Sequence, residues 1–557
     1  MICNWSTYRA VALTLATALA LGAHAAPPAT AKALSLAPKG THVSLALPAL
    51  SESLDEYVAL AKKVAVGVDI DAELAKIVAD LSADANATGA TSIPEVATAK
   101  GLDPAQPIAL FLDLSKTVDS LRAAQKGDDG GEAKAEDAGD AAAAEMEVSG
   151  DFEADAPAWA VLVGVSDAAK AEAFVKELGD KMPEKPASEE VEKGGHKVSV
   201  AGDYAHFQAH DKLVLGTKDL VLATAEQFDH ERSVRYGSEE VTAGPNEIVA
   251  LVDVVTLAPV LEEMSGLIQG DESGKATVAA LAANFKTAFA TPVGNDPLLI
   301  TLSLDEKRAD LKMRVDTSKY PAYLTTYGGA QKLALAPYLP ENILALLSFR
   351  LNEQTKKLLT DQVIPALQAS GQEAAVYAIP AMNLLGDEIT LGIAAVENDF
   401  PAAYLMIALN EPEQAVGLIN MLVPAMPAET YNEVEIKAIA APIPVPLSMA
   451  TPGGMLLVSN NVEGMKKIID QQKTGGSSKV YEGMSQPFKA DTPRYQALVL
   501  KSALLTDVVM PLSALAGGLP PDVAPGAEAF TNSVEEIRMV SELDGDWSVA
   551  QLTAFLK

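Results

Sequence analysis

Residues 157–167, PAWAVLVGVSD, are matched without a gap by residues 401–411, PAAYLMIALNE. In both stretches an apolar run leads into a residue suited to cap a helix, Ser166 or Asn410, and an amphipathic segment follows. An internal match of this kind in a long chain is typical of a duplicated structural unit. We therefore expect the chain to contain two copies of one unit.

The match continues on both sides of these stretches, where apolar runs of strand length follow one another in the same order. Short loops or hairpins join the runs, which favours antiparallel pairing with helices covering a sheet. The sequence therefore predicts an α+β fold: two tandem copies of a mainly antiparallel sheet with helices packed on one face. The matched runs are 41–47 with 341–347, 107–114 with 388–395, 248–252 with 496–500, and 298–304 with 537–543.

Several polar residues stand where helices are expected to begin. Ser53 with Glu56 has the spacing of a capping box. Ser166 and Thr217 are the predicted caps of two later helices in the first copy. These residues set the expected start of each helix.

The first residues have the pattern of an export signal. Arg9 precedes a small and apolar run at 10–21, and Ala23-His24-Ala25 gives the small-x-small pattern of a cleavage site. The sequence thus predicts a signal peptide at 1–25. Because the single cysteine, Cys3, lies before the cleavage site, the mature chain is expected to have no cysteine, which fits a bacterial periplasmic or secreted protein.

Two boundaries divide the rest of the chain. The first copy is predicted at 33–332 and the second at 333–557, because a Ser-Lys-Tyr-Pro sequence and two glycines interrupt the pattern between them. An acidic insertion at 123–156 has no counterpart in the second copy, and its composition predicts a disordered loop. No later stretch is apolar over the length of a membrane span, so we expect no transmembrane segment after signal cleavage.

The composition excludes some classes of partner. A formal net charge of −33 argues against nucleic acid, because its binding requires Lys and Arg to neutralise phosphates. The same charge argues against an anionic membrane surface. A hydrophobic content of 49% with only 5% aromatic residues predicts cores built from aliphatic side chains.

Candidate catalytic and metal-binding residues are scarce. His206 and His210 are four residues apart, but the alternating pattern around them predicts a strand, on which that spacing is about 13 Å. Two side chains so far apart cannot share a zinc ion at about 2 Å from each. Known nucleophile and phosphate-loop motifs are missing from the sequence as well. We therefore predict no catalytic residues, no metal site and no cofactor.

Three stretches of the first copy carry a resemblance to a known family. Ser166–Leu178 forms a cap followed by a helix, Glu192–Ser199 a charged glycine turn, and Lys212–Lys218 a strand that closes on a capped helix. In this order they resemble exported bacterial proteins of the domain-of-unknown-function 3352 family. The resemblance implies an exported protein of similar fold and implies no activity, because the family has none assigned.

The second copy is rich in methionine and contains a proline-spaced apolar stretch. Methionine lines adaptable apolar surfaces, so an apolar ligand or a partner protein could dock there. The alternative is a core packed with methionine beside an edge strand whose prolines prevent aggregation. The residues predicted for this surface are Ile443, Val445, Leu447, Met449 and Met455.

These observations predict an exported, non-catalytic protein that binds a partner or interacts within the cell envelope. Its partner would be an unknown protein or an apolar ligand, and the sequence does not define the oligomeric state. One alternative is a periplasmic carrier of a lipid-like ligand. A second alternative is an enzyme whose site is assembled from distant loops.

Overall fold

The computed structural model describes most of the two predicted copies. The predicted signal peptide at 1–25 and the acidic insertion at 123–156 lie outside the described residues. These residues are 33–38, 40–64, 69–82, 89–119, 122, 157–181, 187–229, 235–236, 239–240, 247–267, 272–290, 292–293, 297–305, 307–323, 332–351, 356, 384–397, 400–422, 428–439, 445–475, 494–515 and 530–557.

The chain forms two compact units. Unit 1 comprises Met1–Leu54 and Asp71–Leu299, and unit 2 comprises Asp55–Ile70 and Ile300–Lys557. Helix α3 (Leu50–Val64) crosses from one unit to the other in the sequence. The two units therefore do not coincide with the predicted boundary at 332, because the end of the predicted first copy belongs to unit 2.

Unit 1 contains a run of antiparallel strands that pair in the order β4-β5-β6-β7-β3-β2-β1-β10. Its strands are β1 (Val43–Leu47), β2 (Ile108–Asp113), β3 (Ala158–Gly164), β4 (Ser188–Lys193), β5 (His196–Ala201), β6 (Tyr204–Ala209), β7 (Lys212–Thr217) and β10 (Glu247–Val252), with a separate pair, β8 (Arg235–Tyr236) and β9 (Glu239–Glu240). Its helices are α4 (Ile70–Ser82), α5 (Ile93–Ala99), α7 (Ala168–Asp180), α8 (Lys218–Gln227), α9 (Val254–Leu267) and α10 (Glu272–Ala288).

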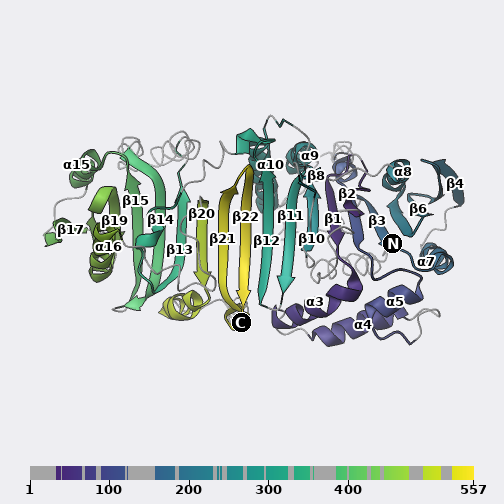
Figure 1. Cartoon of the computed structure of the whole chain (residues 1–557), viewed down its shortest axis with the longest axis horizontal. Coiled ribbons are helices and arrows are strands. Elements are labelled where there is room, and N and C mark those ends of the chain that lie inside the picture. The colour runs from purple at the N-terminus through teal and green to yellow at the C-terminus, as the bar shows by residue number, and fades with distance from the viewer. Residues whose placement is uncertain are drawn as a thin grey trace, which may run out of the picture. The chain divides into compact units, whose positions relative to one another are not determined.

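Unit 2 is built in the same way, with antiparallel strands in the order β16-β17-β18-β19-β15-β14-β13-β20-β21-β22-β12 (Figure 1). Its strands are β12 (Arg308–Asp316), β13 (Ile343–Arg350), β14 (Leu385–Glu397), β15 (Phe400–Leu409), β16 (Ala428–Tyr431), β17 (Val434–Ile439), β18 (Leu447–Ala450), β19 (Met455–Ser459), β20 (Arg494–Lys501), β21 (Val534–Asp544) and β22 (Trp547–Leu556), and β11 (Leu298–Asp305) begins at the boundary. Its helical segments are α15 (Pro412–Leu422), α16 (Val462–Thr474), α17 (Met510–Leu515), the 3-10 turns η1 (Ala336–Tyr338) and η4 (Pro452–Gly454), and the π-helical turn η6 (Leu505–Val509).

The predicted fold of two tandem α+β copies, each with helices on one face of its own sheet, is wrong. Apart from β8 and β9, the strands belong to one 20-stranded sheet. Helices also pack on both faces of it in unit 1: Val214 lies in a cluster with α8, whereas the adjacent Leu213 lies in a cluster with Ala171 of α7. Successive strand residues point to opposite faces, so α7 and α8 cover different sides.

The order of strand pairing nevertheless recurs in the two units. The pair β3–β7 aligns Leu162 with Val214, and the pair β15–β19 aligns Met406 with Leu457. Met406 is the residue that the sequence match places over Leu162. The gapless match at 157 and 401 therefore marks strands that occupy the same place in the order of pairing.

Helix starts differ from prediction at several positions. The predicted capping box at Ser53 is wrong, because α3 begins at Leu50 and the Ser53 hydroxyl donates to the carbonyl of Ala49 at 2.7 Å. The cap of α7 is Asp167, whose carboxylate accepts from two backbone N–H groups, and not the adjacent Ser166. Ser166 and Asp167 both have side chains that can cap a helix, so the sequence does not specify which of the two is the cap.

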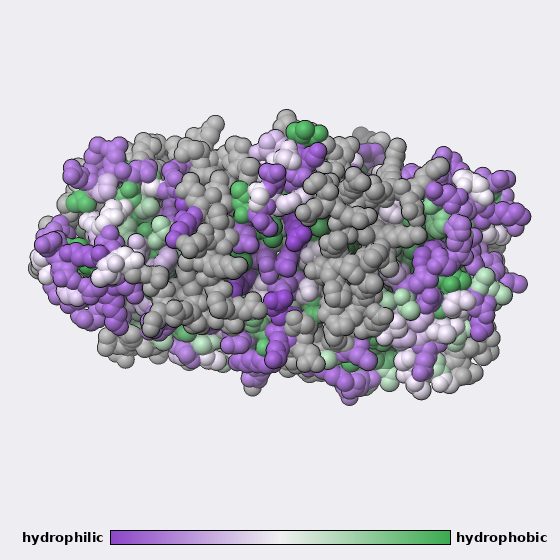
Figure 2. Space-filling view, viewed as in Figure 1, coloured by the Kyte–Doolittle hydropathy of each residue, from purple (hydrophilic) through white to green (hydrophobic). Residues whose placement is uncertain are grey.

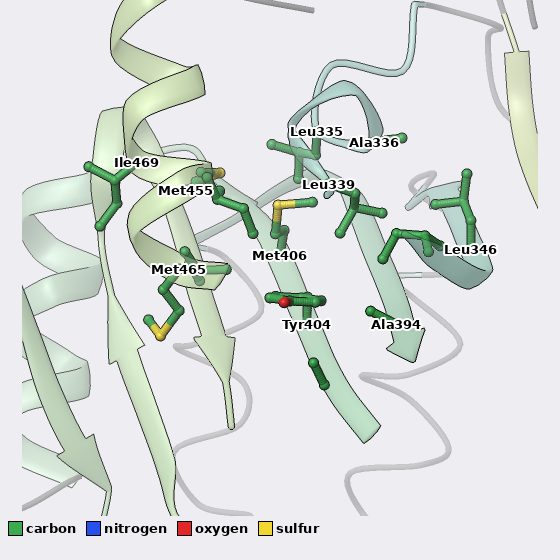
Figure 3. Close-up of a cluster of buried hydrophobic side chains, with 14 of the residues drawn as sticks. Leu335, Ala336, Leu339, Leu346, Ala394, Tyr404, Met406, Met455, Met465 and Ile469 are labelled. Carbon is green, nitrogen blue, oxygen red and sulfur yellow. The ribbon is translucent and has the colours of Figure 1, made fainter. Parts of the chain in front are cut away.

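The core of unit 2 is filled by aliphatic and methionine side chains. Met406, Met465 and Leu457 are completely buried between the sheet and α16 (Figure 3). η1 covers the neighbouring strands with Ala336 and Leu339, both completely buried. This packing uses the face of the sheet opposite to the surface described next.

Candidate binding surface

One apolar side chain from each of nine strands of unit 2 lies on a single cross-strand row. Cross-strand partners in an antiparallel sheet point to the same face, so the register alone places these side chains side by side. We call this set the apolar row. It runs Leu311, Leu552, Met539, Leu498, Leu347, Leu391, Leu405, Val458 and Met449.

The apolar row contains most of the strongly exposed apolar side chains that the structure describes. Five large apolar residues are exposed, and three of them, Leu311 (41%), Leu391 (40%) and Leu552 (41%), belong to this one row. The other two, Val293 and Phe400, lie elsewhere. Single exposed apolar residues are ordinary on a protein surface, but their concentration on one row indicates a docking surface.

The rows on either side of the apolar row are uncharged too. Together the three rows form what we call the apolar face, whose only polar members are Gln496 and Ser541, in a chain of which 21% is charged. All of its residues except Ala345 and Met449 are half-buried or exposed. The flanking rows are Ala309, Ala554, Ile537, Leu500, Ala345, Ile393 and Ala403 on one side, and Met313, Ala550, Ser541, Gln496, Phe349, Ile389, Ile407 and Leu456 on the other.

The same strands carry charged side chains on their opposite face. Asp310, 1% exposed, forms an ion pair with Arg308 at 2.6 Å and accepts a hydrogen bond from Gln551 at 2.9 Å. On β21, Arg538 pairs with Glu536 at 2.7 Å. Figure 2 shows hydrophilic residues along the middle of the view, where Figure 1 places β21, β22 and β12. Alternation along β12 and β21 thus places these charges on the face opposite to the apolar row.

The predicted apolar patch of the second copy is divided between two environments. Met449 ends the apolar row and is 6% exposed, while Met455 is 2% exposed in the core on the other face. Val445 and Leu447 are half-buried, and Ile443 lies outside the described residues. The structure thus does not bring the four described residues together on one surface.

His206 and His210 of unit 1 contact two different carboxylates. His206, on β6, lies 3.5 Å from Glu172, and His210, in the turn after β6, lies 3.6 Å from Asp229. Asp229 is also 3.3 Å from His196, whose ring stacks on Phe207. No group of three or more potential metal ligands is found among the described residues.

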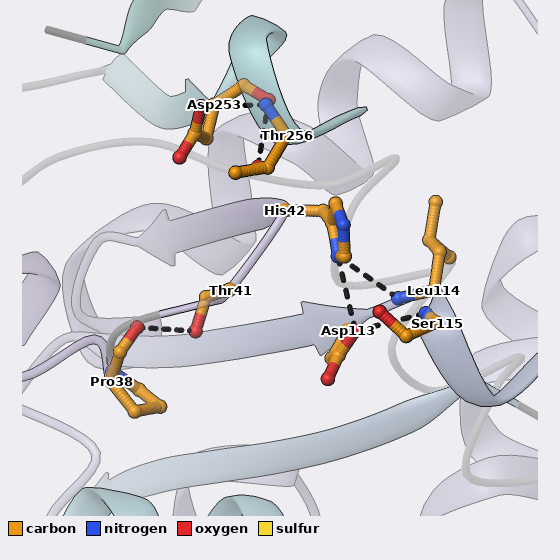
Figure 4. A network of polar contacts seen from close by, with 8 residues as sticks. All are labelled: Pro38, Thr41, His42, Asp113, Leu114, Ser115, Asp253 and Thr256. Carbon is orange, nitrogen blue, oxygen red and sulfur yellow. Dashed lines mark hydrogen bonds and ion pairs between the residues drawn. The ribbon is translucent and has the colours of Figure 1, made fainter. Parts of the chain in front are cut away.

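A buried polar network lies next to the start of β1 and connects it to the end of β2 and the start of α9. His42 is 4% exposed; its Nδ1 accepts a hydrogen bond from the Leu114 N–H at 3.2 Å and lies 3.1 Å from Asp113 Oδ1 (Figure 4). The carbonyl of His42 accepts from the N–H of Asp253, which begins α9. These contacts hold strand and helix ends together, and we interpret the network as structural.

Two further features lie outside the apolar face. A depression of about 410 Å³ is lined by Pro94, Glu95, Thr98, Ala99 and Lys170, on α5 and α7. On the β16–α16 contact, a hydrogen bond from Tyr431 to Asp470 raises the pKa of the tyrosine, and hydrogen bonds to Glu429 and Glu463 raise the pKa of Lys466. Tyr431 and Lys466 form hydrogen bonds with neighbouring carboxylates. The depression contains none of the methionines that were predicted to line an apolar surface.

Charged and apolar residues alternate at 308–316, and this pattern predicts a strand with one charged and one apolar face. It does not reveal the apolar row, because Leu311 and Leu552 meet only through the pairing of β12 with β22. Sequence reasoning therefore missed the surface that the register assembles.

No family model matches this chain, and no curated protein matches it. The structure is similar to solved crystal forms of TP0453. Crystal form III, at 9% identity and a TM-score of 0.20, covers 51% of this chain and 78% of that chain. Crystal form IV, at 9% identity and a TM-score of 0.21, covers 52% and 83%. TM-scores this low carry no argument about fold or function. Within the described part of the chain, no helix has both the length and the apolarity to cross a membrane.

Proposed function

We propose that this is an exported, non-catalytic binding protein of the bacterial envelope, and that the apolar face of unit 2 is its binding surface. The observation that carries the proposal is the apolar row, with three of the five exposed large apolar side chains of the described residues. Binding of an apolar partner would remove this uncharged surface from water, which contributes a favourable free energy of binding.

The shape of the surface favours a protein partner over a small apolar ligand. Small ligands are held in concave pockets that cover most of their surface, whereas the apolar face is the side of a sheet. Three methionines of the second copy, Met406, Met455 and Met465, line no ligand cavity and pack in the core (Figure 3). A carrier of a lipid-like ligand is therefore the less favoured alternative.

The non-catalytic part of the proposal has a different basis. Known nucleophile motifs are missing from the sequence, and the buried polar clusters of His42 and Glu388 are occupied with contacts that position backbone. Export to the periplasm or beyond rests on the apolar run at 10–21 with its cleavage pattern. Membership of the domain-of-unknown-function 3352 family likewise rests on the sequence resemblance.

An apolar fluorescent probe, 1-anilinonaphthalene-8-sulfonate, tests the binding surface. At a protein concentration low enough for the apolar row to be open to the probe, we expect Leu391→Glu to reduce the fluorescence of probe bound to the folded protein, because it places a charge on the apolar row. Val293→Glu is the matched control, since Val293 is 70% exposed and lies outside the row, and it should leave the signal unchanged. Equal signals from wild type and Leu391→Glu, both shown folded by circular dichroism, would contradict the proposal.

A further inference from the structure

We infer that the partner on the apolar face is a second copy of this chain, an inference that rests on the proposed function. Burial of the same surface on both molecules would make a symmetric, face-to-face dimer of the two sheets. Three properties of the apolar face point to this occupant: its area, its lack of charge and the composition of the apolar row.

The area of the apolar face suits a protein interface. Nine strands about 4.8 Å apart span roughly 38 Å across the sheet, and three rows of side chains about 6.7 Å apart span roughly 13 Å along the strands. The product, roughly 500 Å² on each copy, gives about 1,000 Å² for two copies, which is about the smallest area expected of a specific protein interface. A single acyl chain would leave most of this surface in water.

The lack of charge matters because each copy carries a formal net charge of −33. Two such chains repel one another, and an interface containing carboxylates would bring like charges into contact. On the apolar face no carboxylate or cation is placed in any of the three rows, so two copies can meet there without desolvating a charge. The charges of β12 lie on the opposite face, where Asp310 and Arg308 pair.

The apolar row is self-complementary in composition. It consists of leucine, methionine and valine, whose side chains can interdigitate with an identical row when two sheets pack at the usual angle of about 30°. Leu498 lies midway along the row between the exposed Leu552 and Leu391. A two-fold axis at Leu498 therefore brings Leu498 of each copy together and covers the exposed leucines of both.

The oligomeric state of the mature, full-length protein tests the inference. We expect sedimentation equilibrium at micromolar concentration to give twice the mass of one chain for wild type and Val293→Glu, and the mass of one chain for Leu498→Glu. Leu311→Glu, at the exposed end of the row, is a milder second variant that should raise the dissociation constant about tenfold or more without disturbing the fold.

The outcomes separate this inference from the proposed function. A monomeric wild type whose probe fluorescence still falls in Leu391→Glu would overturn the dimer and leave the binding surface in place. A monomeric wild type with no such change would overturn both. A dimer that persists in folded Leu498→Glu and Leu311→Glu would show that the chain associates through another surface, and would also overturn the inference.

Cysteine cross-linking locates the interface directly. The mature chain is expected to have no cysteine of its own, so Leu498→Cys would introduce a unique thiol at the proposed axis. With a short bismaleimide reagent, whose arm spans the ~10 Å between two packed sheets, we expect a cross-linked dimer from Leu498→Cys and none from Val293→Cys at the same concentration. Equal cross-linking of the two variants, or none in Leu498→Cys, would contradict an axis at this residue.

Discussion

Glu388 shows how one residue can distinguish two units with the same strand pairing. Its carboxylate, 3% exposed, accepts hydrogen bonds from the N–H groups of Ala334 and Leu335 at 2.7 and 2.9 Å. Beside it, the hydroxyls of Ser348 and Thr390 lie 2.8 Å apart as a cross-strand pair. The corresponding pair in unit 1 is Ala46 and Ala109, so the buried polar anchor belongs to unit 2 alone.

We expect Glu388→Gln to destabilise the protein by about 1–3 kcal/mol, because the amide nitrogen replaces an oxygen that accepts from a buried N–H group. Asp387→Asn is the control on the same strand: Asp387 is 53% exposed and pairs at the surface with Arg350, so its loss should cost less than about 1 kcal/mol. Urea unfolding midpoints measure both effects. Similar midpoints for the two variants would show that the backbone contacts of Glu388 contribute little.

At the scale of elements, the turn of the β16–β17 hairpin docks on the end of α16 through Tyr431. The hydrogen bond from the Tyr431 hydroxyl to Asp470, 2.9 Å long, favours the protonated phenol. This raises the pKa of Tyr431 above the ordinary value of about 10. The turn itself uses two residues with positive φ, Asn432 and Glu433, where the equivalent β4–β5 turn of unit 1 uses Gly194 and Gly195.

A raised pKa in the folded state makes this contact sensitive to alkaline pH. The stabilisation is fully present below the pH at which an unfolded tyrosine ionises, and it is lost as the pH rises through the folded pKa. We expect the ¹³Cζ resonance of Tyr431 to titrate with its midpoint at a higher pH than that of an exposed tyrosine. Asp470→Asn should move this midpoint to a lower pH. An unchanged midpoint in Asp470→Asn would mean that burial, and not the hydrogen bond, sets the shift.

Individual elements were predictable where local signals are strong, and their assembly was not. The match of 107–114 with 388–395 correctly identified β2 and β14, because apolar runs of strand length are local features. The cap predicted at Ser166 was wrong by one residue, since the neighbouring Asp167 also has a capping side chain, and Ser53 lies inside α3, which begins at Leu50. The joining of twenty strands into one sheet, and of Leu311 with Leu552 in one row, depends on pairing between residues far apart in the sequence, which no local pattern specifies.

At the scale of the whole molecule, a net charge of −33 and an uncharged apolar face act in opposite directions on self-association. Apolar burial favours the dimer at every ionic strength, whereas the charge opposes it over distances that salt controls. The screening length falls from about 30 Å at 10 mM salt to about 8 Å at 150 mM. Repulsion between the two acidic chains should therefore weaken strongly across this range.

We expect the dissociation constant of the wild-type dimer to fall on the order of tenfold, about 1.4 kcal/mol, between 10 and 150 mM sodium chloride. Most interfaces built on ion pairs respond in the opposite direction, because salt screens their attraction. Sedimentation equilibrium at the two salt concentrations measures the change, with Leu498→Glu as the control that should stay monomeric in both. A dimer that dissociates as salt is added would place charged groups in its interface, and the uncharged face of unit 2 would then not be the surface that joins the two chains.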